Sequence, residues 1–169
     1  MIPARKSFIP TNNIKLISKT VEQVHAMLAA MGPAEKKQLS ADWLVRFRAA
    51  PSADPWTHGF NIVHRENDIV VGHAGFIAPP TANGTAEIAY GVNPEHRGKG
   101  YATEAAQALV DYAFESGHVR VVCAHTLPEP NASTRILSKC GFRNQGEVVH
   151  PEDGLVWRWE KTIRQIWTT

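Results

Sequence analysis

A basic, glycine-rich loop between a strand pattern and a helical pattern constrains the fold of this chain more than any other feature. The loop reads Arg-Gly-Lys-Gly at 97–100, and the run at 101–115 after it carries its apolar residues on one broad stripe. Such a stripe is typical of a helix that packs against a sheet. The segments TAEIAYGV (85–92) and VRVVCAHT (119–126) read as strands on either side of that helix. This order predicts a strand, a crossover helix and a second strand at the centre of the fold.

Further strands and helices surround this centre. Strand patterns occur at 14–19, 60–66, 69–77, 142–150 and 155–161, and helical patterns occur at 21–31, 36–48 and 131–139. Asn67-Asp68 predicts a hairpin turn, so we expect the strands ahead of the loop to form an antiparallel meander. With 169 residues, 43% of them hydrophobic, the chain predicts one α+β (mixed α/β) domain over residues 1–169.

Charge and apolar segments bear on partners and location. Eighteen Lys and Arg residues against 16 Asp and Glu residues give a net charge of +2, which is too small to argue for nucleic acid or an anionic membrane as partner. No segment is apolar for long enough to span a bilayer, and the N-terminal stretch lacks the apolar core of a signal peptide. Cys123 and Cys140 read as reduced, buried thiols. These patterns predict a cytoplasmic protein.

The glycine-rich loop is either an ordinary basic connection or a seat for an anion. The first N–H groups of a helix have no intrahelical acceptor, and the aligned peptide dipoles add partial positive charge there. Gly98 and Gly100 remove Cβ atoms that would hold a ligand away, while Arg97 and Lys99 add full charges. Thr103 replaces the third glycine of a dinucleotide-binding loop, and Gly100 replaces the Ser or Thr of a Walker loop. Neither of those loops is present, but a phosphate or pyrophosphate suits the arrangement.

The order of these motifs resembles the GNAT superfamily of acyl-CoA-dependent N-acetyltransferases. The likeness is closer to its Rim-type (RimJ/RimL-like) branch, which acetylates protein N-termini. It rests on AEIAYGVNPEHRGKGYATEAAQALVDYA (86–113) and AHTLPEPNASTRILSKCGF (124–142), whereas roughly the first 58 residues fit only loosely. The resemblance implies a GNAT-like fold with a central, mostly antiparallel, splayed sheet flanked by helices.

The resemblance also implies acetyl-CoA as co-substrate and assigns residues to it. The family's Arg/Gln-x-x-Gly-x-Gly/Ala loop, which cradles the CoA pyrophosphate, matches Arg97, Gly100 and Ala102. The N–H of Val92 is expected to polarise the thioester carbonyl, and Ser133 is expected near the sulfur. The full set of implied cofactor-binding residues is Val92, Asn93, Arg97, Gly98, Lys99, Gly100, Tyr101, Ala102, Thr103, Asn131 and Ser133.

Two positions depart from the family pattern. Pro130 stands where the Rim-type pattern has Asn, so Asn131 either takes over that pantetheine contact or the contact is missing. Leu137 stands where many members have the Tyr that protonates the leaving thiolate. Ser133 or Ser138 could supply that proton through water, or the thiolate could leave without an acid.

The amine that attacks the thioester must be neutral, so a base is expected near it. Glu87 is the candidate, because period-2 alternation places it on the same strand face as Ala89 and Gly91. The alternative is a salt bridge from Glu87 to a neighbouring strand. His73 is a second ionisable candidate, for deprotonation, for lining the amine pocket, or as a hydrogen-bonded structural residue.

Metal and aromatic patterns add little to the site. The chain has eight His residues but no His-x-x-x-His or Cys-x-x-Cys spacing, so the sequence predicts no metal. Trp157 and Trp159 share a strand face and read as sheet packing or as a wall of the acceptor groove.

Together these readings predict an N-acetyltransferase with Glu87, Val92 and Ser133 as catalytic residues. A primary amine, on a protein N-terminus or a small molecule, is expected to attack acetyl-CoA directly in a ternary complex. The alternative is a catalytically silent module that binds acyl-CoA. The sequence does not set the oligomeric state, although the pairing that is common among related enzymes is consistent with a homodimer.

Overall fold

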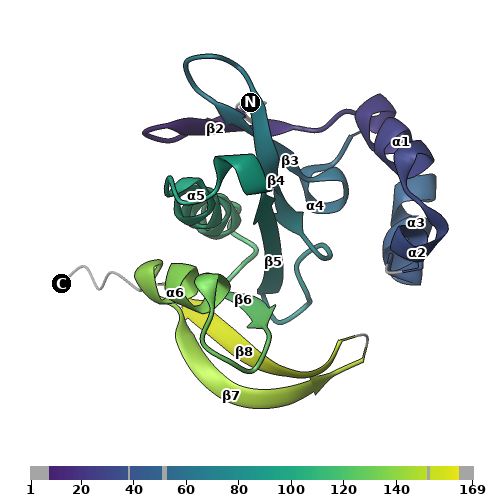
Figure 1. Ribbon diagram of the computed structural model, residues 1–169. Coiled ribbons are helices and arrows are strands. Elements are labelled where there is room, and N and C mark those ends of the chain that lie inside the picture. Colours follow the sequence, from purple (N-terminus) through teal and green to yellow (C-terminus); the bar gives the residue numbers. More distant parts are fainter. Residues whose placement is uncertain (1–7, 38, 51–52, 152, 164–169) are drawn as a thin grey trace.

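The computed structural model describes residues 8–163 except 38, 51–52 and 152, and it is built on one eight-stranded sheet (Figure 1). The strand order is β1-β2-β3-β4-β5-β6-β8-β7. The strands are β1 (Phe8–Pro10), β2 (Ile14–Ser18), β3 (Phe60–His64), β4 (Val70–Phe76), β5 (Thr85–Val92), β6 (Val121–Thr126), β7 (Arg143–His150) and β8 (Gly154–Thr162). The helices are α1 (Val21–Ala30), α2 (Pro33–Lys36), α3 (Ala41–Ala49), α4 (Pro55–His58), α5 (Tyr101–Glu115) and α6 (Ala132–Lys139), with a 3₁₀ turn η1 (Pro94–His96).

The sheet divides between β5 and β6. These two strands are parallel, and every other pairing among the described strands is antiparallel. Their ladder has only three residue pairs, from Thr85↔Val121 to Glu87↔Cys123, although β5 continues to Val92. The mostly antiparallel, splayed sheet and its central crossover, both expected from the sequence, are therefore confirmed.

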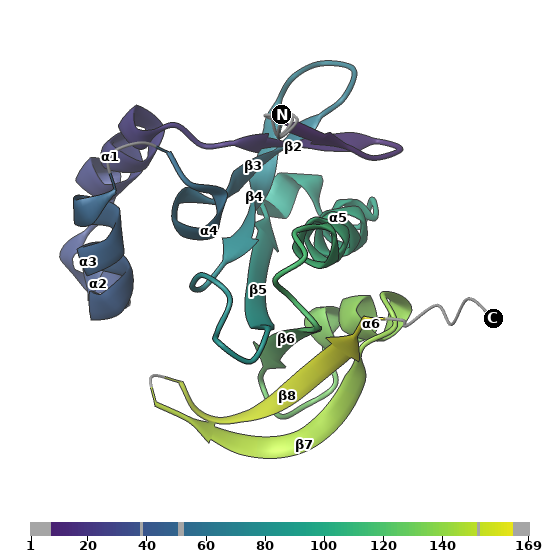
Figure 2. The ribbon, with the colours of Figure 1, turned by 180° about the vertical axis from the view of Figure 1, so that it is seen from behind.

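Helix α5 is the crossover, and it begins and ends where the sequence indicated. Its buried stripe, which includes Ala105, Leu109 and Ala113, packs on the face of β5 that carries Ala86 and Ile88. Helix α6 contacts α5 on the same side of the sheet, whereas α1, α2 and α3 lie on the other side, as Figures 1 and 2 show. The two faces of β5 are thus different, one covered by α5 and one facing the N-terminal helices.

Helix α6 ends at a glycine, as predicted. Gly141 has a φ of 86°, and its N–H donates to the carbonyl of Ser138 at 3.1 Å. The N–H of Phe142 donates to the carbonyl of Leu137 at 3.0 Å. These two bonds form a Schellman motif, which needs the left-handed conformation that glycine adopts without strain.

The N-terminal region departs from the sequence prediction. The single helix expected at 36–48 is two helices, α2 and α3, with Gln38 outside the described residues. The break arises because the Ser40 hydroxyl accepts the N–H of Trp43 at 3.3 Å and so caps a new helix. Strand β1 was not predicted, since three residues that end in proline give too short a pattern to recognise.

The hairpin of β7 and β8 closes the sheet, as the sequence predicted. Its register shifts between Asn144 and Glu147, where Gly146 has a φ of 100°. Such a bulge bends the strand and increases its twist. In Figures 1 and 2 the hairpin curves so that its turn lies on the side of the sheet that carries α1, α2 and α3. None of the described helices is both long and apolar enough to cross a bilayer.

Candidate active site

The edge of β5 that faces the split presents backbone groups without a neighbouring strand. The N–H of Asn93 donates to the carbonyl of Val71 at 2.8 Å, and the N–H of Ile77 donates to the carbonyl of Glu87 at 3.0 Å. Odd-numbered residues of β5 are therefore the ones that bond to β4. It follows that the N–H and C=O groups of Tyr90 and Val92 point toward the split.

The glycine-rich loop continues from this edge into α5. Gly98 and Gly100 have φ values of 80° and 82°, a region that residues with a side chain enter only at a cost. Gly100 caps α5 without a side-chain hydrogen bond, which leaves the N–H groups of the first turn facing outward. A Cβ built at either glycine would have no heavy atom within 4 Å. Close packing against neighbouring atoms therefore does not explain why glycine occupies these two positions.

Arg97 links the loop to the end of β5. Its side chain is exposed, and its Nε donates to the carbonyl of Val92 at 3.0 Å. This bond occupies the acceptor that Val92 directs into the split, and it holds the guanidinium at the mouth of the cleft.

One cavity of about 500 Å³ joins the end of β5, the loop and the start of α6. It brings together most of the residues that the sequence assigned to the cofactor: Val92, Arg97, Gly98, Gly100, Tyr101, Ala102, Thr103 and Ser133. Asn93, Lys99 and Asn131 do not line it. Asn131 is the N-cap of α6, and its Oδ1 accepts the N–H of Thr134 at 3.0 Å, so its side chain serves the helix.

Tyr90 also lines this cavity, and the sequence analysis gave its side chain no role. It shares the cavity with Ser133, whose hydroxyl is close enough to influence the ionisation of the phenol. Burial, followed by the proximity of Cys140, raises the pKa of Tyr90 despite the opposing effect of Ser133, so the phenol stays protonated. The alternation of β5 could have found it, because Tyr90 lies on the face opposite Glu87.

The other face of β5 carries the candidate bases. His73 on β4 pairs with Gly91, and a Cβ built at Gly91 would lie 3.3 Å from Cε1 and 3.4 Å from Nε2 of its ring. The imidazole therefore extends over a position that has no side chain. His73 is open to solvent, yet desolvation by the surrounding protein, with a further contribution from Lys19, lowers its pKa. His73 is consequently neutral at pH 7.

Glu87 lies further down the same face and has a partner. Its Oε2 is 3.0 Å from Nδ1 of His125 on β6, which is the link to a neighbouring strand that the sequence analysis kept as an alternative. It lines a different cavity, with Cys123 and Arg158. Val92 lies five positions beyond Glu87 on β5, which is roughly 16 Å in an extended strand.

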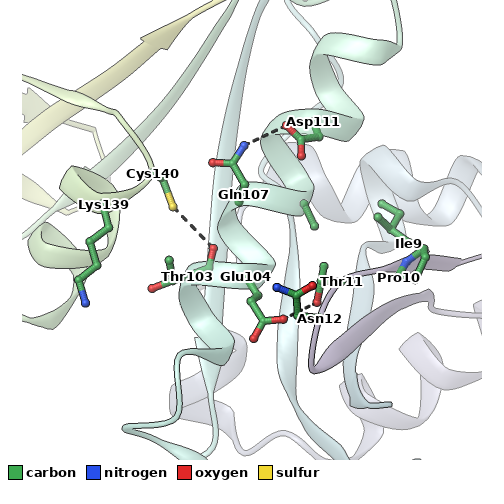
Figure 3. A pocket seen from close by; sticks show the side chains of 11 residues that line it. Ile9, Pro10, Thr11, Asn12, Thr103, Glu104, Gln107, Asp111, Lys139 and Cys140 are labelled. Carbon is green, nitrogen blue, oxygen red and sulfur yellow. Dashed lines mark hydrogen bonds between the residues drawn. The ribbon is translucent and has the colours of Figure 1, made fainter. Parts of the chain in front are cut away.

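A second cavity, of about 490 Å³, adjoins the first and shares Thr103 and Lys139 with it (Figure 3). On its far side the carboxylate of Glu104 accepts hydrogen bonds from Thr11 Oγ1 at 2.7 Å and from the N–H of Asn13 at 2.8 Å. These bonds fasten the connection between β1 and β2 to the first turn of α5. One wall of this cavity is therefore formed by the contact of Glu104 with the β1–β2 connection, which also fixes the start of α5.

Comparison with known proteins decides the family. The profile described as "Acetyltransferase (GNAT) domain" matches residues 13–143. The chain belongs to the GNAT family. Its similarity to the uncharacterised N-acetyltransferase YjdG of Bacillus subtilis is 30% identity over 145 residues, which is 79% of this chain and 84% of that protein. Its similarity to the uncharacterised N-acetyltransferase p20 of Bacillus licheniformis is 39% identity over 87 residues, or 52% of this chain and 49% of that protein. The match thus spans about half the length of p20.

Solved GNAT structures share the fold. One is RimL, a ribosomal L7/L12 α-N-protein acetyltransferase in complex with coenzyme A, with a TM-score of 0.66 and 18% identity over 92% of this chain and 98% of that chain. The family predicted from the loop and crossover is confirmed, and the fold is also that of a Rim-type GNAT protein.

Proposed function

We propose that this GNAT protein transfers the acetyl group of acetyl-CoA to a primary amine by direct attack in a ternary complex. The observation that carries the proposal is the single cavity in which the unpaired edge of β5 runs into the bared first turn of α5. The pantetheine arm can pair with that edge as an added strand would. The pyrophosphate can then reach the N–H groups of α5 and the guanidinium of Arg97.

The N–H of Val92 is positioned to stabilise the charge that develops on the thioester oxygen. It points into the split, because the register gives the bonds to β4 to the odd-numbered residues of β5. A preorganised backbone donor of this kind commonly contributes a few kcal/mol to the transition state.

Ser133 and Tyr90 are placed to receive the leaving sulfur. The Tyr90 phenol remains protonated, and the Ser133 hydroxyl donates toward its oxygen, so the phenolic hydroxyl can be directed toward the sulfur. When the C–S bond breaks, the thiolate accepts a hydrogen bond from that hydroxyl and then takes up a proton from solvent. The pair therefore fills the place of the family tyrosine that Leu137 replaces.

His73 is the residue best placed to take the proton of the attacking amine. The amine nitrogen forms a bond to the carbonyl carbon, the C–S bond breaks, and the excess proton on nitrogen passes to the imidazole directly or through one water. Three features favour His73: it is neutral at pH 7, it is open to solvent, and it leans over Gly91 beside the residue whose N–H meets the carbonyl.

Glu87, the base predicted from the sequence, stays a candidate that acts through a chain of water molecules. Its contact with His125 and its distance along β5 from Val92 weaken that role. The variants Glu87→Gln and His73→Gln separate the two. The one that holds the base should lose kcat/KM and its acidic pH limb, and the other should keep both.

The experiment that tests the proposal measures thiol release from acetyl-CoA with a panel of amines, which includes N-terminal peptides and small primary amines. Turnover with one class names the acceptor. Calorimetry with CoA on the same protein separates the two remaining outcomes. Binding without turnover would indicate the silent acyl-CoA-binding module, which the family comparisons do not favour, and absence of binding would refute the proposal.

A further inference from the structure

Three potential metal ligands from three different strands converge on the face of the sheet opposite α5. Glu87 of β5, His125 of β6 and His150 of β7 each offer one ligand atom, and these atoms all lie within 4.8 Å of one another. Glu87 Oε2 and His125 Nδ1 are 3.0 Å apart, and the rings of His125 and His150 have centroids 5.1 Å apart at an angle of 61°. The residues lie far apart in the sequence, so no spacing motif announces them.

The burial of the three side chains suits a site that a dissolved ion can enter. Their exposed fractions are 25% for Glu87, 10% for His125 and 20% for His150. They are shielded enough to lose much of their water, yet each keeps an opening to solvent.

We propose that Glu87, His125 and His150 form a binding site for a divalent transition-metal ion, with Zn²⁺ as the best match. Two imidazoles and one carboxylate are a ligand set that zinc takes in proteins, with water in the fourth position. At Zn–N and Zn–O distances of about 2.0–2.1 Å, neighbouring ligand atoms of a tetrahedron are about 3.3 Å apart. The Glu87–His125 pair is already near that separation, and the ion would replace the proton that the two atoms share.

The surroundings of His150 support this assignment. Its Nδ1 lies 3.4 Å from Oδ2 of Asp153, and coordination through Nε2 would keep that contact. A carboxylate that accepts from the second nitrogen of a ligating histidine fixes its tautomer and raises its basicity. Asp153 belongs to the turn of the β7–β8 hairpin, which curves toward this face in Figure 2.

We attribute the convergence of the ligands to the bend that accompanies the bulge at Gly146. In the sheet order, β8 separates β7 from β6, so a flat hairpin would hold His150 two strands away from His125. The bend brings the end of β7 back over the sheet. Arg158, which lines the adjacent cavity, opposes a cation there, but its Nε is 3.4 Å from Oε2 of Glu160, which offsets that charge.

A bound ion would tie together strands that only a few contacts connect. It would join β5 to β6 just where their short ladder ends at Glu87↔Cys123, and it would hold the hairpin turn against both. The expected consequence is a metal-dependent gain in thermal stability. This inference does not rest on acetyl transfer, and its tests need no acetyl-CoA.

The test is a titration of the tag-free, chelator-treated protein with Zn²⁺ by calorimetry, together with visible absorption spectra of Co²⁺ as a probe of tetrahedral geometry. We expect one equivalent to bind, and the unfolding midpoint to rise with added Zn²⁺. His150→Ala should weaken binding at least tenfold, and Asp153→Asn should weaken it by a smaller factor. His118→Ala, which removes an exposed histidine outside the cluster, is the matched control and should bind as the wild type does.

Several results would overturn the proposal. Absence of Zn²⁺ binding by the folded protein is one. Binding that His150→Ala and His125→Ala leave unchanged is another, because it would place the ion elsewhere. His150 lies beside the hairpin turn, so His150→Ala is expected to fold even if His125→Ala does not, and its own thermal unfolding curve verifies that it does.

Discussion

Replacement of Arg97 separates cofactor binding from folding. In the folded protein the Arg97 side chain is exposed, and its Nε donates to the Val92 carbonyl at 3.0 Å, so the loss of that bond should cost about 1 kcal/mol of stability or less. A hydrogen bond from a guanidinium to a diphosphate contributes more, about 1.5–3 kcal/mol. Arg97→Ala should therefore weaken acetyl-CoA binding roughly 10- to 150-fold. Arg97→Glu should weaken it further, because it adds a charge that repels the diphosphate.

The assay is calorimetric titration with CoA alongside thermal unfolding, followed by the KM for acetyl-CoA. Arg97→Lys should be intermediate, because it keeps the charge but loses the Nε contact with Val92. Arg48→Ala removes an exposed arginine on α3 and is the matched control. The differences should shrink as salt rises, since exposed charges are screened. If Arg97→Glu keeps the wild-type affinity and melting temperature, the loop is not the seat of the diphosphate.

Three further predictions follow from single residues. In the wild type the acidic limb of the kcat/KM profile should lie below the usual pKa range of histidine, because the pKa of His73 is lowered and a base works only when deprotonated. If the His73→Gln variant keeps this acidic limb, His73 is not the base. Desolvation acts to raise the pKa of Glu104, but hydrogen bonds from the β1–β2 connection outweigh it and lower that pKa. The ionised carboxylate therefore stabilises the fold fully above the unfolded pKa of about 4.3, and this stabilisation is lost as the pH falls through the lowered folded-state pKa. Melting curves between pH 7 and 3 should then show a smaller loss for Glu104→Gln than for the wild type. A Cβ at Gly72 would lie 2.1 Å from the carbonyl oxygen of Gly91, so Gly72→Ala should cost about 3 kcal/mol in denaturant unfolding, whereas Gly32→Ala, with no atom within 4 Å, should cost little.

Local signals predicted the centre of this fold well. The glycines at 98 and 100, the apolar stripe of α5 and Gly141 each act through their own backbone or their nearest neighbours, so the sequence reveals them. The N-terminal helices were predicted less well, because one serine cap at Ser40 decided where α3 begins. The apolar pattern at 36–48 runs through the break and does not report such a cap.

The partners of the site residues were harder to predict, since they depend on register. Glu87 was recognised as an ionisable residue on a strand, but its contact with His125 follows from the parallel pairing of β5 with β6. The approach of His150 depends on how far a bulge bends a hairpin. The alternation of β5 predicts the face on which Tyr90 lies, but its proximity to Ser133 depends on where α6 packs.

The three-pair ladder between β5 and β6 has a consequence for motion. The strands β1–β5 and the strands β6, β8 and β7 form two halves of the sheet that are joined by this short ladder and by the packing of α5. A ligand bound between β5 and β6 would add hydrogen bonds to the free edge of β5 and make the connection between the two halves more rigid. Amide hydrogens of β5 and β6 that face the split should then exchange with solvent more slowly when the ligand is bound. That slowing would show that the two halves of the sheet move less independently.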